Sequence, residues 1–217
     1  MRGITIILNN ESIHTGDDLD LVQEKKEIGK PTTQSFTVQV PGRNGLLNLT
    51  KGLTGKVTYY NRPLSFQYFG TGDRERLLYL DAFMSRYHGE TIRIIDDDYP
   101  GYYYEGEVSV ETTFAPSGNY ITINLEVDAQ PFRLKLEPTI FSRSVSDTTI
   151  VRLYNESIPA IPEVTISSQM TINNGSKEYT LEAGTYSIED FELKRGVNDF
   201  TVIGTGVITF KYQEGAI

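Results

Sequence analysis

The sequence predicts a mainly β protein of two domains: a β-rich N-terminal domain with one α-helix, and a C-terminal antiparallel β-sandwich. Polar and apolar residues alternate along most of the chain, which is typical of half-buried strands. One segment, residues 73–88, has helical spacing instead. After Phe132 the chain becomes a series of short strand candidates separated by turn residues. At roughly 150 residues per domain, a chain of 217 residues allows two small domains, and we expect them to span residues 1–135 and 136–217.

The first strands of the N-terminal domain are predicted from alternation and turn residues. Residues 34–40 alternate between polar and apolar side chains and predict one strand. Residues 56–60 and 64–69 flank Asn61-Arg62-Pro63, whose residue types favour a turn, so a hairpin is expected there.

The helix is predicted between these strands and the next group. Its apolar residues recur at spacings of three and four: Leu77, Leu80, Met84 and Tyr87. Asp73 is suited to the N-cap, because its carboxylate can accept hydrogen bonds from the free amides of the first turn. Gly89 follows as a stop signal.

Three more strands are predicted at residues 91–95, 102–110 and 120–128. The last is the clearest, because every second residue along it is apolar. Residues 96–101 combine three aspartates with Pro-Gly, which predicts a turn.

The C-terminal domain is predicted to contain seven short strands. They are expected at residues 148–153, 163–167, 177–181, 184–188, 190–194, 199–203 and 206–212. Glycine-containing turns separate them, and Gly204 is expected to separate the last two.

The composition excludes several classes of function. The chain has no Cys, no Trp and two His, so thiolate metal sites and a Cys nucleophile are excluded and histidine chemistry has few participants. Its 20 basic and 29 acidic residues argue against broad binding of a nucleic-acid backbone. The apolar run at residues 4–8 is far shorter than the roughly 18 residues of a membrane span, and we expect no signal peptide.

Acidic and histidine residues are the candidates for metal binding or catalysis. Asp96-Asp97-Asp98 could bind a hard cation, but three consecutive aspartates lack the alternate spacing of a calcium loop, so a solvated turn is favoured. Asp17, Asp18 and Asp20 receive the same interpretation. Neither His14 nor His88 accompanies a Gly-x-Ser-x-Gly motif, and His88 is expected to donate to the last helix carbonyls.

Two features suggest protein contacts. A turn is predicted at Pro41, Gly42, Arg43, Asn44 and Gly45. The planar guanidinium of its arginine is suited to bind a carboxylate or the backbone of a partner protein. The 14 tyrosines include the consecutive Tyr102, Tyr103 and Tyr104, which fit either an interface or a strand whose residues alternate between core and solvent. We select these eight residues as the candidate interface.

The order of several motifs resembles the distal tail protein (Dit) family of long non-contractile-tailed phages that infect Gram-positive hosts. In the first domain these motifs are residues 40–45, 60–66, the helix with His88-Gly89, 94–100 with the three tyrosines, and 129–132. In the second domain they are residues 155–162, Leu193, 196–198, 204–206 and 210–215. The resemblance lies in their collinear order across nearly the whole chain.

The resemblance implies a structural role. It implies that the N-terminal domain closes into a homohexameric ring, with a double ring possible in isolation, and that a galectin-like sandwich projects outward. The implied partners are the major tail tube protein, the tail-tip or baseplate protein and the receptor-binding apparatus. It implies no enzyme activity, no metal and no cofactor. The expected location is the distal end of the virion tail, after assembly in the host cytoplasm. DNA would pass through the lumen without being bound directly, and no membrane contact is expected.

A carbohydrate-binding module or adhesin, acting through the C-terminal sandwich, is the alternative. The lack of Trp weighs against it, because sugar-stacking platforms favour that side chain. A glycosidase with two carboxylates ranks third, since no acid/base pair is recognisable.

Overall fold

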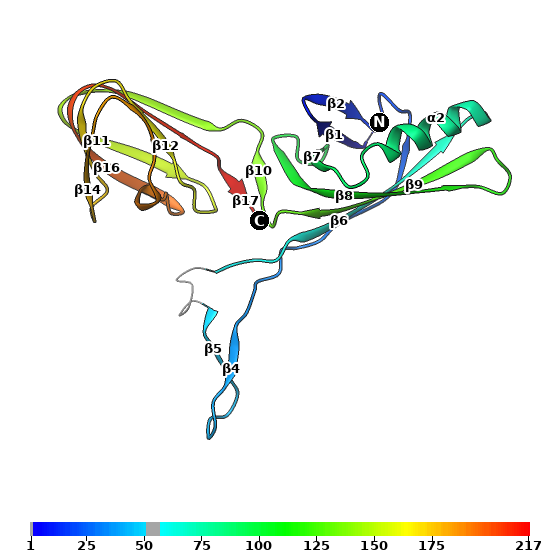
Figure 1. Ribbon diagram of the computed structural model, residues 1–217, viewed down its shortest axis with the longest axis horizontal. Helices are drawn as coiled ribbons and strands as arrows, with labels where there is room; N and C mark the ends of the chain where they lie inside the picture. The colour runs from blue at the N-terminus through cyan, green and yellow to red at the C-terminus, as the bar shows by residue number, and fades with distance from the viewer. Residues whose placement is uncertain (1, 51–56) are drawn as a thin grey trace. The chain divides into compact units, whose positions relative to one another are not determined.

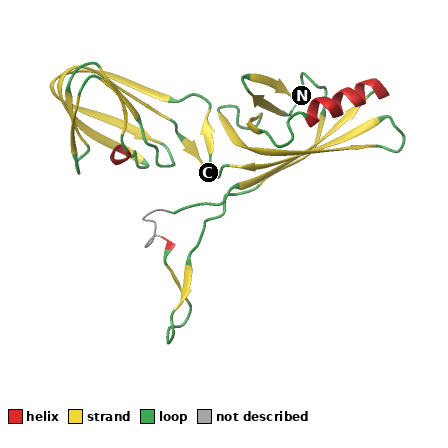
Figure 2. Ribbon diagram, in the orientation of Figure 1, coloured by secondary structure: helices red, strands yellow, loops and turns green. Residues whose placement is uncertain are grey.

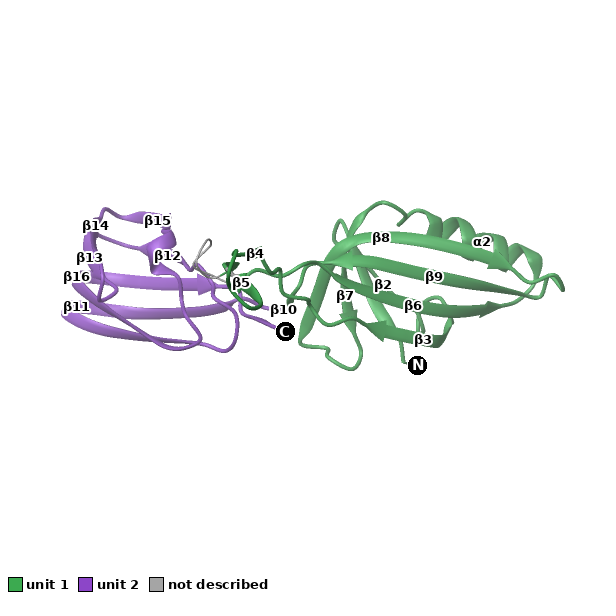
Figure 3. Ribbon diagram, turned by 90° about the horizontal axis from the view of Figure 1, so that it is seen from below, with its two compact units in different colours: residues 1–133 green, residues 134–217 purple. Residues whose placement is uncertain are grey.

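The computed structural model describes residues 2–50 and 57–217 and divides the chain into two compact units. Unit 1 comprises residues 1–133 and unit 2 residues 134–217, as Figure 3 shows by colour. The boundary expected from the sequence was 135/136. The chain is mainly β, as predicted, and strands dominate both units (Figure 2).

Unit 1 is built on one antiparallel sheet with the strand order β2-β1-β7-β8-β9-β6-β3 (Figure 1). The strands are β1 (Ile4–Leu8), β2 (Glu11–His14), β3 (Val22–Ile28), β6 (Arg62–Thr71), β7 (Thr91–Asp96), β8 (Tyr102–Phe114) and β9 (Tyr120–Ala129). The strands predicted at residues 91–95, 102–110 and 120–128 correspond to β7, β8 and β9.

Helix α2 (Arg74–Ser85) covers one face of this sheet. The Asp73 side chain accepts from the Arg76 amide at 2.9 Å, which confirms the predicted N-cap. Leu77, Leu80 and Met84 are buried against the sheet, as their spacing predicts. The helix ends three residues earlier than predicted, and hydrogen-bonded turns lead from it to Gly89.

The predicted hairpin at Asn61-Arg62-Pro63 is wrong. Strand β6 begins at Arg62 and runs through Pro63, which lies opposite Asp128 of β9. Pro63 lies one residue beyond the last β3–β6 register pair, Ile28 with Leu64, where its missing N–H is tolerated. Residue 56, in the other arm of that predicted hairpin, lies outside the described residues.

Unit 2 is an antiparallel sandwich organised around two long paired strands. Strands β11 (Thr139–Asn155) and β16 (Gly196–Tyr212) pair along their whole 17-residue length. The other edge of β16 pairs first with β13 and then with β12, so β16 contributes to both halves of the sandwich. Smaller elements complete it: β12 (Glu163–Ile166), β13 (Met170–Asn173), β14 (Glu178–Leu181), β15 (Gly184–Ser187) and the short 3₁₀ helix η1 (Glu189–Phe191). Strand β17 (Gly215–Ala216) pairs instead with β10 (Arg133–Lys135), which spans the unit boundary.

Three details of the predicted sandwich are wrong. Gly204 does not end a strand, because its positive φ of 145° is accommodated inside β16, opposite Asp147. The strand expected at residues 148–153 begins much earlier, at Thr139, and belongs to the long strand β11. The strand expected at residues 190–194 is replaced by η1 and an isolated bridge at Leu193, because Phe191 and Leu193 both turn into the core.

No helix among the described residues is long and apolar enough to cross a membrane.

Candidate functional site

The chain between β3 and β6 forms a two-stranded ribbon, defined here as residues 29–50 and 57–61. At its base, the Gly29 amide donates to the Pro63 carbonyl at 2.9 Å. An antiparallel bridge joins Thr33 to Tyr59 further along. At its outer end, β4 (Thr37–Gln39) pairs with β5 (Leu46–Asn48), and Figure 1 shows the two strands side by side. Of the strand predicted at residues 34–40, only residues 37–39 are strand, and they belong to the ribbon instead of the main sheet.

The ribbon carries apolar side chains that its own fold does not bury. Phe36 and Val38 are each 48% exposed, and Leu46 is 62% exposed. Large apolar side chains gathered on a segment with no core of its own are typical of a contact surface. The ribbon is thus the strongest candidate in unit 1 for contact with another chain.

The predicted Pro41–Gly45 turn lies at the tip of this ribbon, between β4 and β5. All five residues are exposed. Gly42 and Gly45 have φ angles of 82° and 81°, and a Cβ added at either would meet no atom within 4 Å. Glycine is therefore needed at both positions for backbone conformation, not for space. The structure brings the tip residues together, and their contact with a partner stays a prediction.

The three consecutive tyrosines are the first residues of β8, and unlike the residues at the tip of the ribbon they are largely buried. Tyr103 and Tyr104 are 8% and 3% exposed, whereas Tyr102 is partly buried. Each ring has an arginine from its own chain over it: Arg133 on Tyr102, Arg93 on Tyr103 and Arg62 on Tyr104. Core packing and cation–π contacts thus account for much of this tyrosine cluster, and a partner contact through it also stays a prediction.

The three aspartates at the end of β7 and directly after it are not simply a solvated turn. Asp96 is 1% exposed, and both its carboxylate oxygens lie 2.8 Å from Lys26 Nζ of β3. Asp98 accepts from the same ammonium group. Burial opposes the charge on Lys26, but the hydrogen bonds to the two aspartates raise its pKa overall. The expectation of a solvated turn is therefore wrong for Asp96, which ties this turn to the edge strand.

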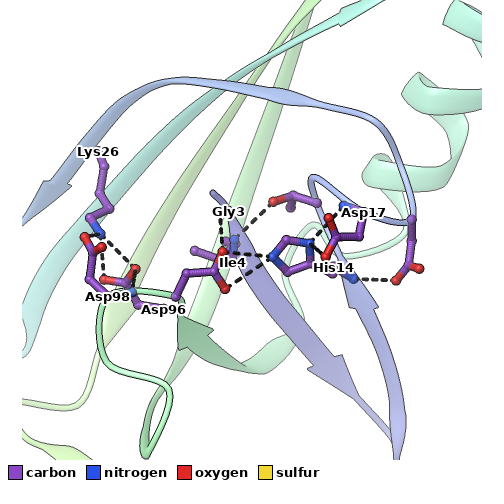
Figure 4. A network of polar contacts seen from close by, with 10 residues as sticks. Gly3, Ile4, His14, Asp17, Lys26, Asp96 and Asp98 are labelled. Carbon is purple, nitrogen blue, oxygen red and sulfur yellow. Dashed lines mark hydrogen bonds and ion pairs between the residues drawn. The ribbon is translucent and has the colours of Figure 1, made fainter. Parts of the chain in front are cut away.

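His14 stabilises the neighbouring loop (Figure 4). Its Nε2 lies 3.2 Å from an Asp97 oxygen, and its Nδ1 accepts from the Asp17 amide at 2.9 Å. The same Asp97 carboxylate accepts from the Gly3 amide at 2.8 Å. The described residues contain no group of three or more His, Asp or Glu side chains arranged to hold a metal ion. His14 and Asp97 therefore hold the N-terminal strands against the turn after β7.

His88 does not cap the helix, so that expectation is wrong. Its Nδ1 accepts from the backbone amide of Val110 in β8 at 3.0 Å. The reason is that α2 has already ended at Ser85, which places the imidazole beside the sheet.

Unit 2 has a polar hollow of about 430 Å³ beside η1. Asp190, on its wall, accepts from Lys177 at 2.7 Å and from the Tyr179 hydroxyl, and both hydrogen bonds lower its pKa. The one aromatic residue lining the hollow is Phe200, which is 3% exposed. A sugar would find polar groups there but no exposed ring to stack on, so the hollow does not favour the carbohydrate-binding alternative.

Two arginines of unit 1 were missed from the sequence. The sequence pattern predicts a turn at Arg62 and indicates no role for Arg133. The alternation of Leu64, Phe66 and Tyr68, extended backward through Pro63, would have placed Arg62 on the core face. The structure buries it there, 4% exposed.

The fold and these surfaces define a two-unit β protein with a protruding ribbon and no recognisable catalytic constellation among the described residues. No protein-family model and no curated protein sequence matches the chain. Among solved structures, it is similar to the crystal structure of SPP1 Dit (gp 19.1), described as a paradigm of the hub adsorption apparatus in phages that infect Gram-positive hosts. The match has a TM-score of 0.62 at 16% identity and covers 99% of each chain. This likeness shows that the chain has a Dit-like fold.

Proposed function

We propose that this protein is a structural hub subunit of a long non-contractile phage tail. The observation that carries the proposal is the fold match, which runs through both units and covers 99% of the chain and of SPP1 Dit. A match to one unit alone would support only a shared module. A match along both units supports a shared role, because the same two modules follow each other in the same order.

Within this role, unit 1 assembles into a homohexameric ring. A cyclic head-to-tail assembly needs two different surfaces on each subunit. The ribbon is suited to be one of them, because a neighbouring copy would cover the exposed Phe36, Val38 and Leu46. The ring joins the tail tube to the tail-tip or baseplate protein and the receptor-binding apparatus, and the protein resides at the distal end of the virion tail.

The charge balance is compatible with a ring through which DNA passes. Each chain carries a net charge of −9, and a ring multiplies that charge around its axis. Acidic groups lining the lumen would keep DNA from adhering. An assembled ring with a strongly basic lumen would contradict this part of the proposal.

Light scattering on the purified protein tests the assembly. We expect a mass about six times the 24.4 kDa of the chain, or twice that value for a double ring. A monomer that persists at high protein concentration would contradict the ring. Co-purification with the tail tube protein and with the tip protein of the same phage tests the partners. If unit 1 forms the hub, binding of both partners should depend on unit 1 and not on unit 2.

A further inference from the structure

Two arginines of unit 1 lie close together without an acidic partner. Arg62, at the start of β6, is 4% exposed, and its guanidinium carbon lies 5.3 Å from the centre of the Tyr104 ring. Its Nε donates to the Gly29 carbonyl at 3.0 Å, but its buried Nη1 has no hydrogen-bond partner. A buried guanidinium whose donors are incompletely paired is energetically costly.

Arg133 lies on the same side of β8 as Arg62. Its guanidinium carbon is 4.3 Å from the centre of the Tyr99 ring and 5.1 Å from that of Tyr102. Tyr102 and Tyr104 are two residues apart on one strand, so their side chains point to the same face. The buried Nε of Arg133 also lacks a partner.

Burial lowers the pKa of Arg62, and the nearby positive charge of Arg133 lowers it further.

Four of the other arginines are paired, and the remaining five are exposed to solvent: Arg2, Arg43, Arg74, Arg143 and Arg195. Carboxylates accompany Arg76 (Asp20), Arg86 (Glu11), Arg93 (Glu105) and Arg152 (Asp199). Within residues 2–50 and 57–217, neither Arg62 nor Arg133 forms an ion pair. Arg62 and Arg133 differ from the exposed arginines because each has a buried guanidinium nitrogen without a hydrogen-bond partner.

We propose that Arg62 and Arg133 bind a carboxylate presented by a second copy of the chain. This inference rests on the proposed ring. Paired guanidinium forks match a carboxylate, and the tyrosine rings hold them in place. The hydrogen bond from Arg62 to Gly29 places the site at the base of the ribbon, and the outer part of the same ribbon carries the surface proposed to contact the neighbour. The acidic chain itself supplies abundant carboxylates for such a contact.

The test compares Arg133→Gln with Arg93→Gln in the full chain. Both changes remove an arginine stacked on a tyrosine of β8, but Arg93 already has Glu105 as its partner at 2.7 Å. Mass photometry across a dilution series gives the protein concentration at half-assembly. For Arg133→Gln we expect this concentration to rise by about tenfold or more, and for Arg93→Gln to stay within about twofold. Thermal unfolding of both variants verifies that each is folded.

The outcomes separate this inference from the proposed function. If the wild type forms rings and Arg133→Gln assembles at an unchanged concentration, the carboxylate site is wrong and the hub proposal stands. If the wild type is monomeric, the hub proposal itself fails. If about 100 mM inorganic phosphate raises the unfolding temperature of the wild type but not of Arg133→Gln, and assembly is unaffected by the substitution, the site takes free oxyanions and the second copy is ruled out as the source.

Discussion

Glu214 is the residue that most clearly shows how a buried charge is stabilised in this protein. It is 4% exposed and lies in unit 2. Lys135 Nζ donates to it at 2.9 Å, the Glu156 amide donates at 3.0 Å, and the Thr139 hydroxyl donates as well. Burial alone would raise the pKa of Glu214, but these hydrogen bonds together hold it below its usual value.

The lowered pKa of Glu214 predicts how the stability of the protein changes with pH. The carboxyl group has a lower pKa in the folded state than in the unfolded state. Its contribution to the free energy of unfolding is therefore fully present above the unfolded-state pKa and is lost as the pH falls through the folded-state pKa. Glu214→Gln should therefore lower the free energy of unfolding by about 2 kcal/mol at pH 7, and by progressively less in acid. Chemical denaturation at several pH values measures this.

Glu163→Gln is the control for that prediction. Glu163 is exposed on β12, so its substitution should change stability by no more than about 0.5 kcal/mol at any of these pH values. An equal effect of the two substitutions at pH 7, or an effect of Glu214→Gln that grows in acid, would contradict the account of Glu214.

Local residue roles were predictable from the sequence, whereas distant pairings were not. The Asp73 N-cap was found because its partner lies three residues away on the same helix. Asp96 was assigned to solvent because its partner, Lys26, is 70 residues distant and reaches it only through the strand order of the sheet. The alternation along β6 indicates the core face of Arg62, but the lack of a partner for its guanidinium depends on distant strands and is not visible in the sequence.

At the scale of elements, strands β8 and β9 approach each other closely at Gly106. A Cβ added there would lie 2.4 Å from the Asp128 carbonyl oxygen and 2.5 Å from the Ala129 Cα, which are both backbone atoms. These atoms cannot move aside as a flexible side chain would. Gly106→Ala should therefore destabilise unit 1 by roughly 1–3 kcal/mol or more, as measured by thermal or chemical unfolding.

Gly101→Ala provides the matched comparison. Gly101 is exposed in the turn before β8, and a Cβ added there would meet nothing within 4 Å. We expect its effect to stay within about 0.5 kcal/mol. If Gly106→Ala is as mild as Gly101→Ala, the close strand contact does not constrain the sheet.

Elements with complete periodicity were predicted best. Helix α2 and strand β9 both show an uninterrupted apolar pattern, and both appear close to their expected bounds. The long β11–β16 pair was divided into shorter strands because glycines and serines inside it resemble turn signals. Pairing along a full neighbouring strand overrides such local preferences, and that pairing is not visible in the sequence.

At the scale of the whole molecule, the ribbon should be needed for assembly but not for folding. The Leu49 amide donates to the Phe36 carbonyl at 2.8 Å, so these residues already face each other across the ribbon. Replacing residues 37–48 by Asn-Gly would close it with a two-residue turn. The residues removed include none of the unit 1 core. We expect an unchanged unfolding temperature and the loss of rings on a sizing column.

A shortened ribbon that still assembles would place the subunit contacts elsewhere on unit 1. A shortened ribbon that lowers the unfolding temperature by several degrees would mean that the ribbon contributes to the fold, and that its exposed apolar side chains are not reserved for a neighbour.

Negative-stain electron microscopy of the purified, full-length protein tests the central claim most directly. The proposed hub role predicts class averages of closed rings with sixfold symmetry and a central lumen. Single dispersed particles of about the size of one 24.4 kDa chain, at concentrations where light scattering also finds only monomer, would contradict it.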